Sequence, residues 1–431
     1  MQKVDAKTTQ TKLTKEQKQA VGLLSIGTFL EYFDLMLYVH MAVLLNELFF
    51  PKYDPHIASL INAFTFAVPF LLRPIGAFLI GRVGDRLGRR FTVVITSIIT
   101  AVTCVIIATL PTYDDIGIYA SCILMLCRVM QGIASLGEII GAEIYITESI
   151  KSSAKFPAVT LIYFASVMGS CVALAVGGLT IKYGLNWRIA FWIGAVIAVF
   201  GYFARSHLRE TPDFADANLI LKKITQNQNL CSFREKHNIK NIAAIFLIQC
   251  TWPIWFYLNY FHCQNILKAN FSYSQEDILL HNFCIASIDL AGIGIMIYLS
   301  SKFNAIKILK AKTILFTPFC FMLPFLLDHS TSPFFIFCIQ AFIALFSVST
   351  MPAFPIFIKH FPVFQRFTTV NMTFAISRAL IYVVTAVGFV FLIRNFGNYG
   401  LLFVILPVIS VYIFGLYHFE NLERETTKGV S

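Results

Sequence analysis

Charged side chains are scarce in this chain of 431 residues. They account for 13% of it, while hydrophobic residues account for 57%. A typical soluble domain carries about 25% charged residues, which help to cover its surface. The composition therefore argues against a soluble fold and for a membrane protein.

Signatures of catalysis and of disulfide bonding are also missing. The sequence contains no Walker A motif, no HExxH motif and no G-x-S-x-G motif. Its ten cysteines include no CxxC pair, and eight of them lie in apolar runs. We therefore expect no enzyme, no metal site and no disulfide framework.

Long apolar runs dominate what is present. About 20 apolar residues suffice for a helix to cross a hydrocarbon core of about 30 Å. The first run is too long for a signal peptide and lacks a cleavage site, so it should remain as a helix. The sequence predicts an all-α membrane protein with twelve transmembrane helices, which begin near residues 20, 57, 91, 117, 156, 188, 241, 277, 313, 333, 367 and 400.

Lysine and arginine are distributed unevenly between the two sides of these runs. With the N-terminus inside, 26 of the 34 fall in inner segments, five in outer loops, and Arg73, Arg128 and Arg378 within runs. Short basic segments stay in the cytoplasm, so both termini are expected there. The net charge of +11 is thus a topology signal and does not indicate a nucleic-acid partner.

The longest hydrophilic interval divides the chain into two groups of six runs. We expect a cytoplasmic tail, an N-terminal six-helix bundle, a cytoplasmic linker, a C-terminal six-helix bundle and a second tail. Their expected ranges are 1–19, 20–204, 205–240, 241–419 and 420–431.

A charged hairpin, GRVGDRLGRR at residues 81–90, joins the second and third runs. It resembles the loop signature of the major facilitator superfamily, G-x-x-x-D-[RK]-x-G-[RK]-[RK]. The matching residues are Gly81, Asp85, Arg86, Gly88, Arg89 and Arg90. Glycine permits close approach of two helix ends, and a carboxylate suits a helix N-terminus. An ordinary basic loop would explain the arginines but not the glycines and the aspartate.

The hairpin is predicted to form a gate on the cytoplasmic side. Glu148, at the inner end of the fourth run, should lie near Arg86, Arg89 and Arg90. Asp85 should face the N-terminus of the eleventh helix, near residues 366–369. Such contacts can form only when the two bundles meet on that side, so they would favour the outward-facing state.

Ionisable residues within the runs are the candidates for transport chemistry, because each costs about 2.5–3.5 kcal/mol at mid-membrane. Glu31 and Asp34 lie three residues apart on one face of the first helix. Together with Glu138 they are predicted to couple protons. Arg128, Arg73 and Gln131 are predicted to bind a substrate carboxylate. The alternative is that these charges form ion pairs that orient helices.

Aromatic residues cluster around Pro253 in the seventh run. Trp252, Trp255 and Tyr257 could form a cage for a quaternary ammonium group through cation–π attraction. Aromatic packing or an interfacial belt is the alternative.

Five motifs narrow the resemblance to the metabolite:proton symporter branch, which includes proline/betaine, α-ketoglutarate, citrate and shikimate carriers. They are EYFD at 31–34, RPIG at 73–76, R-x-x-Q-G-x-x-x-x-G-E from residue 128, NWRIAF at 186–191 and LRETPDF at 208–214. Leu136 and Ile140 depart from the small residues usual in that branch. Bulk there could narrow the cavity or alter helix packing.

The resemblance implies a secondary transporter in the bacterial inner membrane, which binds a small-molecule substrate and protons and needs the lipid bilayer. It needs no cofactor beyond a proton gradient, no nucleic acid and no obligate protein partner. The expected substrate is a zwitterion of the proline/betaine type. A carboxylate carrier and a transport-incompetent sensor are the alternatives.

Overall fold

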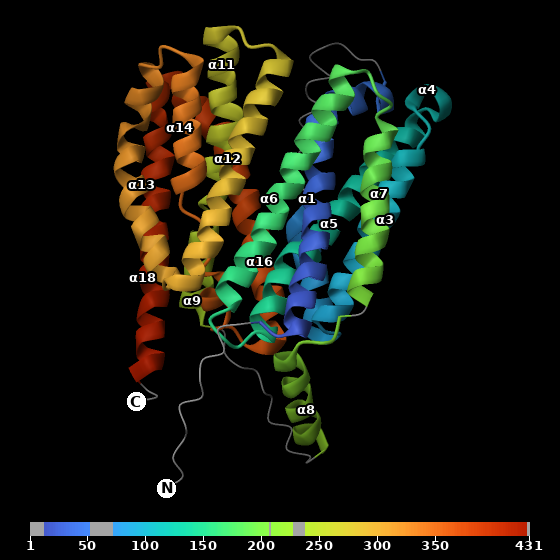
Figure 1. The fold of residues 1–431 in the computed structure, drawn as a ribbon, viewed down its shortest axis with the longest axis vertical. Coiled ribbons are helices and arrows are strands. Elements are labelled where there is room, and N and C mark those ends of the chain that lie inside the picture. The colour runs from blue at the N-terminus through green and yellow to red at the C-terminus, as the bar shows by residue number, and fades with distance from the viewer. Residues whose placement is uncertain (1–12, 52–71, 207, 227–237, 429–431) are drawn as a thin grey trace.

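The computed structural model describes residues 13–51, 72–206, 208–226 and 238–428, which form helices joined by short connections (Figure 1). The described part of the second run is a helix over 72–86; its expected start near residue 57 lies outside the described residues. The other elements of the first half are α1 (Lys15–Phe49), α3 (Arg89–Thr109), α4 (Tyr113–Ile116), α5 (Ile118–Ser149), α6 (Lys155–Lys182), α7 (Arg188–Ser206) and α8 (Pro212–Gln226).

The second half is interrupted more often. Its seventh run divides into α9 (Ile239–Gln249), α10 (Trp252–Tyr257), the π-helix η1 (Leu258–His262) and α11 (Cys263–Phe271). The others are α12 (Gln275–Lys302), α13 (Ala305–Asp328), α14 (Pro333–Phe346), α15 (Phe354–Ile358), α16 (Val363–Val383), η2 (Val384–Gly388), α17 (Phe389–Phe396), η3 (Gly397–Leu401) and α18 (Leu402–Lys428). π-helical turns are frequent at functional sites.

Capping residues set helix starts that hydropathy misplaces. Thr14 and Gln17 form a capping box, so α1 begins at Lys15 instead of near residue 20. The Asn304 side chain accepts a hydrogen bond from the backbone N–H of Ile306 at 2.9 Å, so α13 begins eight residues before the expected 313. The extra turns of α13 carry three lysines that the sequence reading assigns to a loop.

The helices form two bundles that stand side by side (Figure 1). One contains α1, α3, α5, α6 and α7, and the other contains α9 to α18. Helices α6 and α12 pack against each other across the boundary. Eight of the described helices are long and apolar enough to cross a membrane by length and composition. The fold is the predicted all-α, two-bundle membrane architecture.

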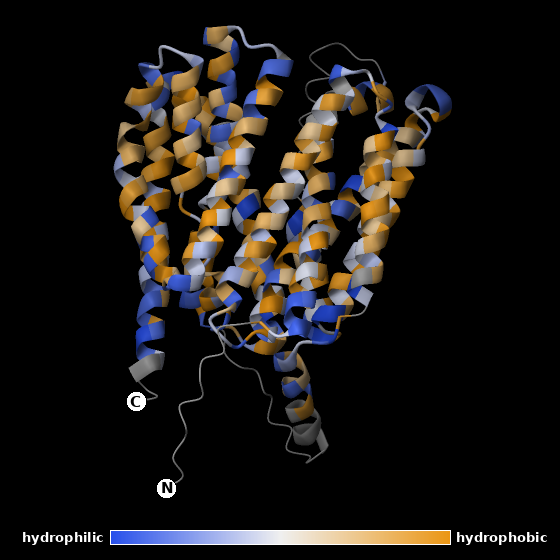
Figure 2. Ribbon diagram, viewed as in Figure 1, coloured by the Kyte–Doolittle hydropathy of each residue, from blue (hydrophilic) through white to orange (hydrophobic). Residues whose placement is uncertain are grey.

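Polar residues concentrate toward the ends of the bundles, while apolar residues cover their length (Figure 2). The end that carries the hairpin 81–90 is called the hairpin end below, and the end that carries α4 is the far end. The expected ranges differ from the helices by a few residues, since α7 continues to Ser206, α9 begins at Ile239 and α18 continues to Lys428. Part of the expected linker is helical, as α8.

Candidate functional site

Glycines bring the hairpin into contact with α16. A Cβ atom at Gly81 would lie 2.6 Å from the Cα of Thr368, and one at Gly84 would lie 2.6 Å from the Phe367 ring. Gly88 has φ of 103°, which side chains rarely adopt. A side chain at any of these positions would push the hairpin away from its neighbours.

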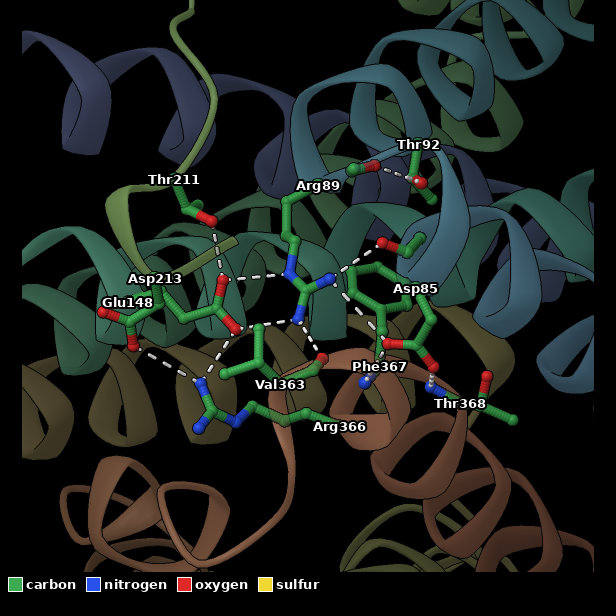
Figure 3. A network of polar contacts seen from close by, with 12 residues as sticks. Asp85, Arg89, Thr92, Glu148, Thr211, Asp213, Val363, Arg366, Phe367 and Thr368 are labelled. Atoms are coloured by element: carbon green, nitrogen blue, oxygen red, sulfur yellow. Dashed lines mark hydrogen bonds and ion pairs between the residues drawn. The ribbon is translucent and has the colours of Figure 1, made fainter. Parts of the chain in front are cut away.

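Arg89 forms the centre of a buried network at the hairpin end (Figure 3). Its Nε and Nη2 donate to the two carboxylate oxygens of Glu148, each at 2.9 Å, which makes a bidentate pair. Arg366 of α16 donates to the same carboxylate at 2.9 Å. Arg89 and Glu148 are 0% and 1% exposed, so solvent screens this pair little.

Asp85 ties the hairpin to the first turns of α16. Its two oxygens accept hydrogen bonds from the backbone N–H groups of Phe367, at 3.0 Å, and Thr368, at 2.9 Å (Figure 3). Burial raises the pKa of the Asp85 carboxyl, while its hydrogen bonds to Thr368 and Phe367 oppose that rise. Arg89 also donates to the carbonyl oxygen of Val363 at 2.7 Å. The two bundles are thus joined at this end.

The three hairpin arginines differ in what they contact. Arg86 is exposed, and the Arg90 guanidinium donates to the carbonyl oxygen of Ser206 at 2.8 Å. Among them only Arg89 reaches the Glu148 carboxylate. The sequence reading did not include Glu210, which accepts from the backbone N–H of Arg89 at 3.0 Å.

Thr211 was also not predicted as part of the network, yet its hydroxyl donates to Glu148 at 2.7 Å (Figure 3). Asp213 lies 3.5 Å from Arg366. Both residues belong to the motif LRETPDF at 208–214. The segment between α7 and α8 therefore belongs to the same network as the hairpin.

Glu138 is paired with Arg205 inside the N-terminal bundle. The two side chains meet at 2.8 Å, and both residues are 0% exposed. Arg205 occupies the space beside Gly27, where a Cβ would overlap its guanidinium. The sequence predicts Arg205 at the start of the linker, whereas the structure places it in the last turn of α7 as the partner of Glu138.

Asp34, Arg128 and Gln131 lie together between α1, α3 and α5. Asp34 accepts a hydrogen bond from the Cys104 thiol at 3.3 Å, and Arg128 donates to Gln131 at 2.8 Å. The Arg128 guanidinium lies 3.8 Å from the centre of the Tyr38 ring. Charge, hydrogen bonding and cation–π contact hold this group within one bundle.

Glu31 and Arg73 are buried in the same bundle at 4% exposure each. Arg73 is the opposite charge that acts most strongly on Glu31. The predicted proton-coupling and carboxylate-binding residues are therefore all buried in the N-terminal bundle. None of them lines the cavity between the two bundles.

A cavity of about 290 Å³ lies between the two bundles. Its walls come from α1 and α6 on one side and from α10 to α14 on the other. Trp252 and Trp255 line it, together with Tyr32, Tyr163 and Tyr260. Its charged lining residues are Asp289 of α12 and Lys312 of α13, which attract each other. Lys312 is one of the lysines that the sequence reading assigned to a loop.

The ring faces of Trp252 are already in contact with other side chains. The Arg378 guanidinium lies 4.4 Å from its ring centre, and Phe256 stacks on it at 5.1 Å. Its indole N–H donates to the Tyr163 hydroxyl at 3.2 Å. Tyr257 packs against Phe389, with ring centres 5.3 Å apart, and does not line the cavity. The protein thus supplies its own cation to Trp252.

Comparison with known proteins agrees with this architecture. A profile of the Major Facilitator Superfamily matches residues 24–425. The proline/betaine transporter of Escherichia coli strain K12 is 30% identical over 276 residues, which are 60% of this chain and 54% of that protein. The putative proline/betaine transporter of Staphylococcus aureus strain COL is 28% identical over 411 residues, which are 89% of this chain and 84% of that protein.

A solved structure supports the fold at lower identity. The proton:xylose symporter XylE bound to 6-bromo-6-deoxy-D-glucose superposes with a TM-score of 0.72, over 93% of this chain and 94% of that chain, at 17% identity. The likeness supports the arrangement of the helices in two bundles.

The chain belongs to the major facilitator superfamily. It is a multi-pass membrane protein. The predicted resemblance to proline/betaine carriers is confirmed, although the match covers about half the length of the Escherichia coli relative.

Proposed function

We propose that this protein is a proton-coupled carrier of a small zwitterion of the proline/betaine type. The names of its relatives support this substrate class. The observation that carries the proposal is the cavity between the bundles, because its lining holds one acidic and one basic side chain, Asp289 and Lys312.

The charge of the cavity favours a zwitterion over a polycarboxylate. A solute with one positive and one negative group can place each beside an opposite charge, Asp289 and Lys312, and leaves no buried charge unpaired. A dicarboxylate or tricarboxylate would bring two or three negative charges to one lysine and into the vicinity of Asp289. Like charges in contact cost several kcal/mol in such sites.

The aromatic rings that line the cavity favour a substrate with a cationic group. Tyr163 and Tyr260 line the cavity and lie close enough to Asp289 to interact with its charge. A quaternary or secondary ammonium group near Asp289 would therefore have aromatic faces around it. Arg378 and Phe256 already contact the ring of Trp252. We therefore assign the cationic group of the substrate to the side of the cavity near Asp289, and not to Trp252.

Proton coupling is proposed on the basis of the buried carboxylates of the N-terminal bundle. Asp34 and Glu31 have exposures of 3% and 4% and remain the first candidates. Glu138 is held by Arg205 at 2.8 Å, so any proton it accepted would have to break that pair. We also propose that the hairpin end faces the cytoplasm of a bacterium, with both termini on that side.

The network of Asp85, Arg89, Glu148 and Arg366 would then close the cytoplasmic side while the cavity is loaded from outside. Transport would proceed as the bundles rock about the cavity and this network separates. Gating by the hairpin residues is thus a proposal about alternating access, supported by hydrogen bonds between residues of opposite bundles.

Counterflow in proteoliposomes tests the substrate class. Vesicles loaded with unlabelled glycine betaine, proline, α-ketoglutarate or citrate are diluted into each labelled compound at equal internal and external pH. We expect exchange of glycine betaine or proline and none of citrate, and loss of that exchange in Asp289→Asn. Glu276→Gln, at the exposed first turn of α12, is the matched control. Exchange of citrate would favour the carboxylate carrier, and binding without exchange would favour a sensor.

A further inference from the structure

A second, smaller cavity of about 40 Å³ adjoins the central one toward the hairpin end, and it contains a pair of charges that no step above uses. The two cavities share Tyr32, Tyr163 and Trp252 as lining residues. Glu143 of α5 and Arg378 of α16 line the smaller cavity from opposite bundles. A solute or a proton that passes from the central cavity toward the hairpin end therefore meets these two charges.

Glu143 has an acceptor capacity that the described residues leave unused. It is 4% exposed, and within the described chain its carboxylate accepts no hydrogen bond. Arg378 is the charge that acts on it. Arg378 donates to the backbone oxygen of Gln249 at 3.2 Å, while its guanidinium stacks near Trp252 and Phe374. Glu143 and Arg378 thus line the same small cavity from opposite bundles without a direct hydrogen bond between them.

The other polar groups that line the smaller cavity are uncharged, and outside it Arg73 of the N-terminal bundle is a like charge that acts on Arg378. Tyr32 of α1 and Tyr163 of α6 face the same cavity from the N-terminal bundle, and Gln249 of α9 and Trp252 of α10 face it from the C-terminal bundle. Tyrosine stays neutral at physiological pH. Arg378 is therefore the opposite charge whose distance from Glu143 would change when the bundles move.

This placement differs from that of the carboxylates predicted from the sequence. Asp34 and Glu138 each have their hydrogen-bond partner in their own bundle, at Cys104 and Arg205. These two hydrogen bonds can persist when the bundles separate at the hairpin end, so coupling through Asp34 also needs a group that spans the interface. A carboxylate can link proton binding to a conformational change only if its interactions differ between the two conformations.

We propose that Glu143 is a proton-coupling residue that acts across the bundle interface through Arg378. When Glu143 is ionised, its attraction to Arg378 favours closure of the hairpin end. A proton that enters through the central cavity binds the carboxylate, converts it to the neutral acid and removes that attraction. The hairpin end then opens, and the proton leaves to water on that side, after which the ionised carboxylate favours closure again. This inference rests on the proposed proton coupling.

Spin labels at the hairpin end measure the distance between the two bundles, and they test the inference in the absence of substrate. Lys151→Cys and Phe303→Cys, both exposed, place one label on each bundle in a cysteine-free background. Distance distributions by pulsed electron resonance give the open fraction in purified protein. We expect Glu143→Gln, which mimics the protonated acid, to raise the open-to-closed ratio about tenfold at pH 8, within the usual range of coupling energies. Glu276→Gln should leave the ratio unchanged.

The pH response and a double variant separate this role from a merely structural one. In the unaltered protein the open fraction should rise as the pH falls, because protonation removes the attraction. That response should shrink in Glu143→Gln. Arg378→Gln should raise the open fraction too, and the double variant should add nothing further, since both remove one interaction. Additive effects, or a full pH response in Glu143→Gln, would overturn the inference.

Transport in vesicles provides the second readout. Glu143→Gln should retain counterflow of whichever solute the unaltered protein exchanges, while accumulation driven by a pH gradient falls at least about tenfold. Coupled accumulation at the normal level would reject the role of Glu143. If the unaltered protein exchanges no zwitterion at all, the proposed substrate class fails, whereas the label experiment still decides the role of Glu143.

Discussion

Asp85→Asn should open the hairpin end, because Asp85 links the hairpin to α16. Its carboxylate accepts hydrogen bonds at 3.0 and 2.9 Å from the backbone N–H groups of Phe367 and Thr368. An asparagine keeps one acceptor oxygen for one of these backbone N–H groups. Its side-chain NH2 group would face the other, and two donors cannot form a hydrogen bond. The substitution also removes the negative charge next to Arg89, whose Nη1 lies 3.8 Å from the carboxylate.

The size of the effect follows from the bond that is lost. A hydrogen bond to a charged group contributes about 1.5–3 kcal/mol. Since Asp85 is 7% exposed, the neutral amide also avoids part of the cost of burying a carboxylate, which offsets some of that loss. The net change is about 2 kcal/mol, which corresponds to a roughly 30-fold shift from the closed toward the open conformation.

The label pair at Lys151 and Phe303 measures this shift, and transport of the preferred solute is assayed in parallel. We expect a larger open fraction and slower transport, with the amount of inserted protein unchanged. Arg82→Gln, an exposed hairpin residue whose guanidinium lies over Phe78, is the charge-removing control. A normal transport rate and unchanged distances in Asp85→Asn would show that the hairpin only anchors the topology.

Three further substitutions test individual groups of the N-terminal bundle. Asp34→Asn should abolish pH-driven accumulation and retain exchange, and full accumulation would remove Asp34 from the coupling set. Arg128→Lys should lower the free energy of unfolding by about 1–2 kcal/mol and leave substrate affinity unchanged, because the contacts of Arg128 with Gln131 and Tyr38 lie within one bundle. A loss of affinity at unchanged stability would instead support its predicted role at the substrate. Glu138→Gln leaves Arg205 buried without its counter-charge and should cost about 3–5 kcal/mol in detergent unfolding. The double variant with Arg205→Gln should recover part of that loss, and no recovery would mean that the two residues do not act as a pair.

The apolar runs and the hairpin motif are sufficient to predict the architecture and the family. Apolar runs of sufficient length leave a chain few alternatives to membrane helices, because backbone polar groups must be satisfied inside the hydrocarbon region. The contact of the hairpin with another helix could also be predicted, because the glycines at 81–90 allow close approach of two helices and the aspartate can accept hydrogen bonds from a helix N-terminus. The contacts of Asp85 and Arg89 with residues near 366 and with Glu148 follow from that motif and from the direction of the helices.

The positions of the remaining charges depend on how the helices pack, which the sequence does not show. Arg205 stands in the last turn of α7, where a long basic side chain can reach water or turn inward, and the choice depends on neighbours far away in the sequence. Glu138 draws Arg205 inward, and the cavity that contains Asp289 receives Lys312. The same holds for Trp252, whose ring face Arg378 covers from another helix. Hydropathy measures how apolar a segment is, but the partner of a buried charge is set by how the two bundles pack.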